Sequence, residues 1–425
     1  MPRTQRLDLA LLLLLAALTN LGYLALSDNY FFPDSATYFE PAKNLLAGHG
    51  FSAPAGVPDT MRTPGYPLLL ALFHSTAKEP VPVLIFQHLL NLALTVAIYV
   101  VTKRATGSRF AAVAAGVVFA ADPASIHYAN KVLTETFFTA ALFAAFLLVL
   151  SIVRGRISTA RIIVAGLLLG ALVLIRPVAV AWFVVVAAMF AFTLRVNRVR
   201  LIALFLASAL PLPIAWGLRN RYHTGVFTIS SIAGTNMIMQ RGAGALAILD
   251  DGDFATDLAD RQKELGAEAD QRIREEEGVA NPRVLDHAVC AVYYSEIGRE
   301  VIREHPLAYA ELTIRGLLVN LFDSDFDAIA SVSLLHESVV ELLLNAWNAL
   351  VIFLALFGVA VLWKRDRPFA GLIFLTTGYF LFMSAGGESE SRFRVPVVPL
   401  IAIAAGAGVG AARKAEMSSQ NARNA

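Results

Sequence analysis

The chain has 425 residues, of which 57% are hydrophobic and only 16% are charged, and its mean hydropathy is +0.61. Soluble globular proteins carry about 25% charged residues, and several runs here approach the roughly 20 apolar residues that a helix needs to cross a bilayer. These numbers exclude a soluble domain and predict an all-α integral membrane protein with about ten transmembrane helices. The net charge of +2 indicates no nucleic-acid partner, and the single cysteine excludes an internal disulfide.

The first apolar run, Leu7–Ser27, follows two arginines at the start of the chain. Ala25-Leu26-Ser27 resembles the cleavage site of a signal peptide. The run is long for such a peptide and many more apolar spans follow, which favours an uncleaved membrane anchor. A cleaved signal peptide is the alternative.

The next segment, residues 28–67, is expected to be the first loop outside the membrane. It contains Asp34, a helix predicted over Ala36–Leu46 that would lie in the membrane interface, and a Pro- and Gly-rich return at Arg62–Pro67. The apolar stretch Leu68–Phe73 is too short to cross the bilayer. We expect it either to dip into the membrane beside a water-filled cavity or to lie on the surface.

Nine further apolar spans are expected: Val81–Val101, Phe110–Ala121, Thr136–Val153, Ala160–Ile175, Val178–Leu194, Leu201–Gly217, Val339–Trp363, Phe369–Ala385 and Val395–Ala412. With ten spans, every cluster of Lys and Arg between spans falls on the same side as the N-terminus, which satisfies the positive-inside rule. Both termini are therefore predicted to be cytoplasmic. The first loop is predicted to face the periplasm or the cell exterior.

Three parts follow from this order: an N-terminal transmembrane module (1–217), an outer lobe (218–335), and C-terminal transmembrane helices with a short cytoplasmic tail (336–425). Within the lobe, Tyr222–Ala245 is rich in Thr, Ser, Gly and Ile, which predicts extended chain and loop. The helices expected after it are Thr256–Glu277, Pro282–Glu304 and an amphipathic Pro306–Phe322 that could lie flat on the bilayer.

Two acidic residues stand at outer ends of spans. Asp34 could cap the helix that follows it, or it could be a fixed general base, and the two interpretations are compatible. Glu135, at the outer end of the fourth span, could be merely solvated, or it could be a second carboxylate that orients a substrate or binds a cation.

Several arginines lie on the predicted outer side, where the positive-inside rule gives no reason for them: Arg176, Arg219, Arg221, Arg392 and Arg394. Arginine makes bidentate contacts to phosphate, which suits an anionic headgroup, although any one of them could simply extend toward lipid phosphate. The histidines have no metal-ligand spacing, and the sequence has no P-loop, Rossmann fingerprint or nucleophile elbow. Cytosolic nucleotide chemistry is therefore not expected.

Taken in order, these motifs resemble the membrane glycosyltransferases of the C superfamily, in particular bacterial relatives of the dolichyl-phosphate-mannose–protein mannosyltransferases. The resemblance rests on the following matches: Asp34-Ser35-x-x-Tyr38, Ala42-x-Asn44-Leu45-Leu46-x-Gly48-x-Gly50-Phe51, Arg62-x-Pro64-Gly65-Tyr66-Pro67, Thr134-Glu135, Arg176-Pro177, Arg219-Asn220 and Arg392-Phe393-Arg394-x-Pro396. They span nearly the whole chain.

The resemblance implies inverting transfer of a sugar from a polyprenyl-phosphate donor to a protein, lipid or glycan acceptor at the outer face of the membrane. It assigns the catalytic base to Asp34. The substrate-binding residues expected from it are Tyr38, Arg62, Tyr66, Glu135, Arg176, Arg219, Arg392 and Arg394. Many members carry an acidic pair where this chain has Asp34 and Ser35, so no cofactor or metal is expected, with a divalent cation as the alternative.

Two other functions stay open at this point. A transporter or flippase for a lipid-linked sugar typically contains ionisable residues in mid-span and a repeated architecture, and neither is evident in the sequence. A glycan ligase or polymerase that uses a diphosphate donor would be served equally well by the arginines.

Overall fold

The computed structural model describes residues 3–53, 56–324, 330, 331, 333 and 335–424, and the ordered elements of this part are helices with one isolated bridge between Ser52 and Pro58. The apolar helices are α1 (Arg3–Leu26), α4 (Val81–Thr106), α5 (Arg109–Ala120), α6 (Pro123–Ala129), α7 (Glu135–Val153), α8 (Thr159–Ile175), η3 (Pro177–Ala181), α9 (Trp182–Thr193), α10 (Arg198–Ala209), α11 (Pro211–Thr224), α18 (Glu337–Arg365), α19 (Arg367–Met383), η6 (Ser391–Phe393), η7 (Val395–Val397) and α20 (Val398–Asn424). The all-α membrane fold expected from the sequence is confirmed.

Each of the ten predicted spans coincides with one of these helices or with a pair of them. Six segments of the described chain are long and apolar enough to cross a membrane, or seven if the bent pair α5–α6 is one span. Shorter apolar helices occupy the other three predicted positions: Thr159–Ile175, Pro177–Thr193 and Arg367–Met383. The short span expected at Phe110–Ala121 continues through a bend of 48° into α6, where the Asp122 side chain caps the new helix.

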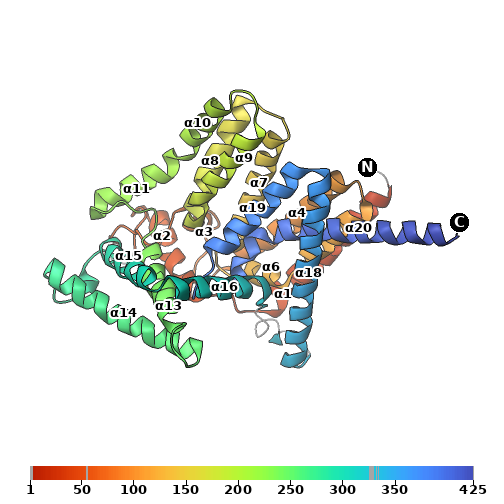
Figure 1. Cartoon of the computed structure of the whole chain (residues 1–425). Helices are drawn as coiled ribbons and strands as arrows, with labels where there is room; N and C mark the ends of the chain where they lie inside the picture. Colours follow the sequence, from red (N-terminus) through yellow and green to blue (C-terminus); the bar gives the residue numbers. More distant parts are fainter. Residues whose placement is uncertain (1–2, 54–55, 325–329, 332, 334, 425) are drawn as a thin grey trace.

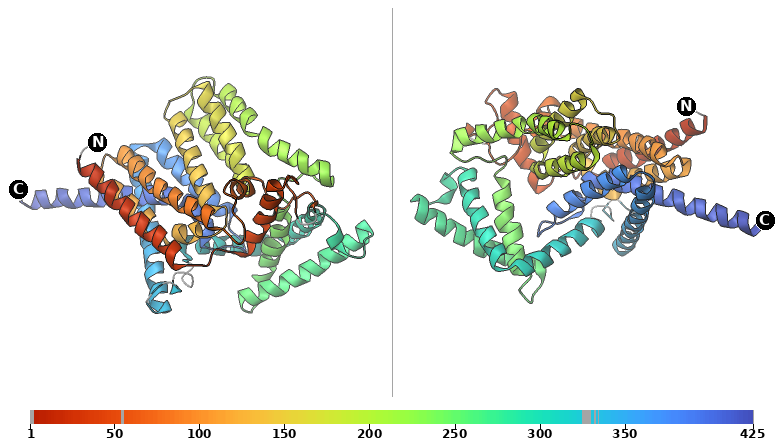
Figure 2. Two further views of the ribbon diagram at one scale, coloured as in Figure 1. Left: turned by 180° about the vertical axis from the view of Figure 1, so that it is seen from behind. Right: turned by 45° about the horizontal axis from the view of Figure 1, so that its top comes forward.

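Helix α20 is the centre of the bundle. In the most apolar 18-residue stretch of its span, 78% of the residues are buried, against 17% in the corresponding stretch of α1. Two glycines allow neighbouring helices to approach closely. A Cβ added at Gly358 of α18 would lie 1.7 Å from the carbonyl oxygen of Ala404, and one at Gly406 would lie 2.4 Å from that of Ala111 on α5. Figure 2 shows α20 running through the bundle and extending beyond it at its C-terminal end.

The first loop and the outer lobe supply the remaining helices: η1 (Pro33–Ser35), α2 (Ala36–Leu46), α3 (Gly65–Leu72), α12 (Ile232–Asn236), the π-helix η4 (Met237–Gly242), α13 (Ala243–Ala247), α14 (Phe254–Glu277), η5 (Pro282–Val284), α15 (His287–Glu304) and α16 (Pro306–Phe322). The helices expected in the lobe are found at α14, α15 and α16. Figure 1 shows α14 and α15 at the end of the molecule farthest from the beginning of α1 and the end of α20. The three-part division of the chain and its orientation across the membrane stay predictions.

The prediction of extended chain over Tyr222–Ala245 is wrong, because α11 continues to Thr224 and residues 232–247 are helical. Small residues in this segment and on the facing helix α15 allow the two to pack closely. A Cβ added at Gly234 would lie 2.3 Å from the carbonyl oxygen of Ala291 on α15, and one at Gly298 would lie 2.4 Å from that of Met237. Packing against α15 overrides the poor helix propensity of Gly, Ser and Thr.

Candidate active site

Asp34 lies in the 3-10 turn η1, between the first span and α2. The turn is fastened at Ser35, whose Oγ accepts the Phe32 N–H at 2.9 Å and donates to the Val132 carbonyl at 2.9 Å. The expectation that Asp34 caps α2 is wrong, since no side chain caps this helix and the Asp34 carboxylate bonds to arginines. The Asp34 side chain remains 33% exposed, so other molecules can reach it.

Two guanidinium groups hold the Asp34 carboxylate from either side. Arg62 Nη2 donates to Oδ1 at 2.8 Å, and Arg392 Nη1 donates to Oδ2 at 3.1 Å. Desolvation by burial favours the neutral acid, but the positive charges of Arg62 and Arg392 outweigh it and hold the pKa of Asp34 below its ordinary value of 3.8. The carboxylate is therefore ionised at neutral pH.

Arg62 has no freedom to turn away from Asp34, because its other nitrogens are also engaged. Its Nε donates to Thr37 Oγ1 at 2.8 Å, its Nη1 donates to the Tyr38 hydroxyl at 3.3 Å, and its Cζ lies 4.7 Å from the centre of the Tyr38 ring. The Asp59 carboxylate accepts the backbone N–H groups of Met61 and Arg62, which forms a tight turn that presents the arginine.

The outer lobe supports the same turn from the other side. Ser231 N–H donates to the Thr60 carbonyl at 2.9 Å, and Thr60 Oγ1 donates to Asp286 Oδ1 at 3.0 Å. Ser231 Oγ is in turn hydrogen-bonded to His287 Nδ1 at 2.6 Å. The start of α15 therefore fixes the segment that carries Arg62.

A second ion pair lies beside the first. Arg176 Nη1, at the end of α8, donates to Glu135 Oε1 at 2.8 Å, and the side chains are 15% and 3% exposed. Glu135 is thus buried and paired, which rules out the interpretation of a merely solvated acid. The Phe393 ring joins the two pairs, since Arg176 Cζ lies 5.8 Å and Arg392 Cζ 4.8 Å from its centre.

Arg392 is the residue shared by most of this cluster. It forms ion pairs with Asp34 and with Glu390, and its Cζ also lies 4.8 Å from the centre of the Phe32 ring. The site thus contains three arginines (Arg62, Arg176 and Arg392) and three carboxylates (Asp34, Glu135 and Glu390). Within the described residues no group of three or more His, Cys, Asp or Glu side chains could hold a metal ion.

Three of the expected substrate-binding residues lie elsewhere or support the site indirectly. Arg394 donates to the carbonyls of Asn320 and Leu321 at the end of α16, and does not bond to Asp34. Arg219 donates to the carbonyls of Asp59 and Phe51, and so holds the turn before Arg62. Tyr66 is fully buried, donates to Gln87 Oε1 at 2.8 Å and packs edge-on against the Tyr38 ring. Arg219 and Tyr66 therefore contact the supports of the site, whereas Arg394 binds the end of α16.

Sequence reasoning did not select Asp59, Thr37 or Glu390. Asp59 had a local signal. An Asp two or three residues before the residue to be placed, here Arg62, is typical of turns in which the carboxylate binds backbone N–H groups. Thr37 had no signal beyond lying one turn into the helix after Asp34. Glu390 stood out only as a neighbour of the arginine pair.

No family model matches this sequence, and no curated protein matches it. Among solved structures the fold is similar to that of archaeal oligosaccharyltransferases. The chain is similar to the archaeal oligosaccharyltransferase AglB from Archaeoglobus fulgidus, solved in complex with an inhibitory peptide and a dolichol-phosphate, with a TM-score of 0.54 and 14% identity over 99% of this chain and 52% of that one. A second structure of an oligosaccharyltransferase from this organism, tethered to an acceptor peptide, gives a TM-score of 0.50 and 14% identity over 94% and 48%. The chain thus spans about half the length of either structure, and the likeness is one of fold.

Proposed function

We propose that this protein is an inverting glycosyltransferase that moves a sugar from a polyprenyl-phosphate donor to an acceptor hydroxyl at the outer face of the membrane. The observation that carries the proposal is the position of Asp34, an ionised and reachable carboxylate between Arg62 and Arg392. A fixed base beside anion-binding groups is what displacement of a lipid phosphate requires.

In the proposed reaction the acceptor oxygen attacks the anomeric carbon from the side opposite the phosphate. The new carbon–oxygen bond forms as the bond between the anomeric carbon and the phosphate oxygen breaks, and the bonding electrons leave with the lipid phosphate. Asp34 takes the proton of the acceptor hydroxyl. A single displacement of this kind inverts the anomeric configuration, and it needs no metal and no general acid because phosphate is a good leaving group.

The arginines have distinct parts in this proposal. Arg62 is held by Asp34, Thr37 and Tyr38 and therefore stays with the base. Arg392 is the group we assign to the departing phosphate, with Arg176 next to it. When the phosphate draws Arg392 away, Asp34 loses one of its two cations. Its pKa then rises, which makes it a better base at the moment it is needed.

The structural neighbours support a lipid-linked donor and a separate acceptor in general terms, because one was solved with a dolichol-phosphate and the other with an acceptor peptide. For this chain we propose an acceptor that is a protein, a lipid or a glycan. We also propose the plasma membrane as its location, with the termini in the cytoplasm and Asp34 on the opposite side.

The test begins with mass analysis of the lipids that copurify with the protein, which identifies the donor. That donor is then incubated with the purified protein in detergent, where no gradient exists, and with extracts that contain candidate acceptors. We expect release of polyprenyl monophosphate and a product with inverted anomeric configuration by NMR. A donor that stays intact in detergent but crosses the membrane in vesicles would contradict the proposal, as would release of a diphosphate.

A further inference from the structure

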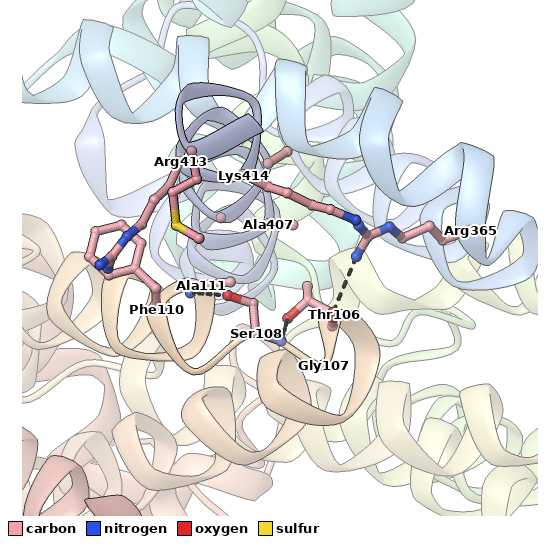
Figure 3. A pocket seen from close by; sticks show the side chains of 12 residues that line it. Thr106, Gly107, Ser108, Phe110, Ala111, Arg365, Ala407, Arg413 and Lys414 are labelled. Carbon is pink, nitrogen blue, oxygen red and sulfur yellow. Dashed lines mark hydrogen bonds between the residues drawn. The ribbon is translucent and has the colours of Figure 1, made fainter. Parts of the chain in front are cut away.

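A cavity of about 340 Å³ lies between the ends of four helices, far from Asp34 (Figure 3). Its walls come from the end of α4, the start of α5, the last residue of α18 and residues 407–417 of α20. None of the site residues described above lines it. It is therefore a separate feature of the molecule.

The cavity and Asp34 belong to opposite surfaces of the membrane. Arg392, which binds Asp34, and Arg413, which lines the cavity, stand at the two ends of the span that runs over Ser391–Ser418. At 1.5 Å per residue, the 21 steps between these two arginines correspond to about 30 Å, the thickness of the hydrocarbon core. On the predicted orientation the cavity opens at the cytoplasmic surface.

Three cations line this cavity, Arg365 and Lys414 on one side and Arg413 against Phe110 on the other, and none of its twelve lining residues, all of them described, is acidic. Arg365 Nη1 donates to the Thr106 carbonyl at 3.1 Å, and Arg413 Cζ lies 4.1 Å from the centre of the Phe110 ring. Figure 3 shows the Lys414 side chain reaching toward Arg365. Arg365, Arg413 and Lys414 are exposed to solvent, and an anion bound between Arg365 and Lys414 would lower the repulsion between their like charges.

Two carboxylates at this end of the bundle are engaged with other cations. Asp8 accepts two hydrogen bonds from Arg109 at 2.6 Å, and Asp366 accepts two from Arg154 at 2.5 and 2.9 Å. Neither of these carboxylates neutralises Arg365 or Lys414, and the acid next to the cavity in the sequence is Glu416, beside Met417 on α20.

The floor of the cavity is lined by the small residues Ala111, Ala407, Gly410 and Ala411. A Cβ added at Gly410 would lie 2.7 Å from the Ala111 Cβ, so α5 and α20 close the floor. At the mouth, Phe110 and Met417 are 42% and 53% exposed. A basic rim beside exposed apolar groups at a membrane surface fits an amphipathic anion better than a soluble one.

We propose that the cavity binds the phosphate headgroup of an anionic phospholipid of the cytoplasmic leaflet, with Arg365 and Lys414 at the phosphate and an acyl chain along the side that carries Phe110 and Arg413. Basic pockets between transmembrane helices on the cytoplasmic side hold such headgroups. This site is independent of the glycosyl transfer proposed above, and its test needs no assay of that activity.

The test uses the full chain, delipidated in neutral detergent and titrated with phosphatidylglycerol or phosphatidylcholine, with retained lipid counted by native mass spectrometry. The variant R365Q/K414Q removes two charges from the cavity, and K364Q/R367Q removes two exposed charges from the same surface outside it. We expect one phosphatidylglycerol to be retained by the wild type and the control, and phosphatidylcholine by neither. Binding to R365Q/K414Q should be about 30-fold weaker, which corresponds to about 2 kcal/mol for two cations.

A charge-keeping variant, R365K/K414R, separates lost binding from lost folding and should bind like the wild type. Equal retention of phosphatidylglycerol by R365Q/K414Q and K364Q/R367Q would overturn the proposal. It would also be overturned if inorganic phosphate at millimolar concentration displaced the lipid fully, because the ligand would then be a soluble anion.

Discussion

Replacement of Arg392 by Gln tests the part assigned to the departing phosphate. The substitution removes the cation that binds Asp34 at 3.1 Å and that also pairs with Glu390. Loss of one fixed donor to charge that develops in a transition state lowers kcat by about 10²–10³, or about 2.7–4 kcal/mol. We expect a loss of this size in kcat for transfer from the lipid-linked donor.

The same change should cost little stability. A hydrogen bond to a charged group contributes about 1.5–3 kcal/mol, and the partly exposed carboxylates of Asp34 and Glu390 reduce this to about 1–2 kcal/mol, because water replaces the arginine. The melting temperature in detergent should therefore fall by only a few degrees. Arg392→Lys is the matched control, and it should recover part of kcat because it keeps the charge but not the planar contacts.

The pH profile of the variant provides an independent readout. Since Arg392 helps to hold the pKa of Asp34 low, its removal raises that pKa. Transfer needs the ionised carboxylate, so the acidic limb of kcat/KM should move to higher pH. A kcat within threefold of the wild type, or an acidic limb that does not move, would refute the role given to Arg392.

Three further predictions concern the wild-type site and its supports. In the wild type, kcat/KM should stay constant until the pH is lowered below 3.8, the ordinary pKa of an Asp. The acidic limb of kcat should lie at higher pH, because the bound phosphate draws one cation away from Asp34. Acidic limbs of kcat and kcat/KM at the same pH would contradict this movement of Arg392 from Asp34 to the phosphate. Glu135→Gln should lower the free energy of unfolding by about 3 kcal/mol, because it leaves Arg176 partly buried without its carboxylate, and Arg176→Gln combined with it should recover part of the loss in a thermal melt. Gly358→Ala should destabilise the protein by about 1–3 kcal/mol through the contact with α20, while Gly378→Ala, whose Cβ meets nothing within 4 Å, should not; equal melting temperatures would contradict the packing described.

The positions of the spans could be predicted from the sequence, because long apolar runs and the placement of Lys and Arg carry that information locally. The helices at 232–247 could not, since their glycines look like turn residues until the opposing helix α15 is known. Propensity is a local quantity, and here tertiary packing decided the outcome.

The candidate site was predictable only in part. Asp34 and Arg392 are 358 positions apart, so no spacing rule joins them, and the resemblance to glycosyltransferases supplied the pairing. Arg392 and Arg394 were expected to act together, yet only Arg392 reaches Asp34. Arg392 lies in the 3-10 turn η6 and Arg394 lies between η6 and η7, and in such tight turns residues two apart point in different directions. Arg394 therefore turns toward the end of α16.

The proposed function requires that Asp34 remove the acceptor proton during sugar transfer from a lipid phosphate. It is tested most directly by comparing Asp34→Asn with Asp28→Asn, the same isosteric change at an exposed position in the same loop. Arg62 and Arg392 keep other partners in the first variant, so both variants should fold like the wild type. We predict that polyprenyl phosphate release falls 10²–10⁴-fold in Asp34→Asn and is unchanged in Asp28→Asn. Release at the wild-type rate by Asp34→Asn would contradict the account.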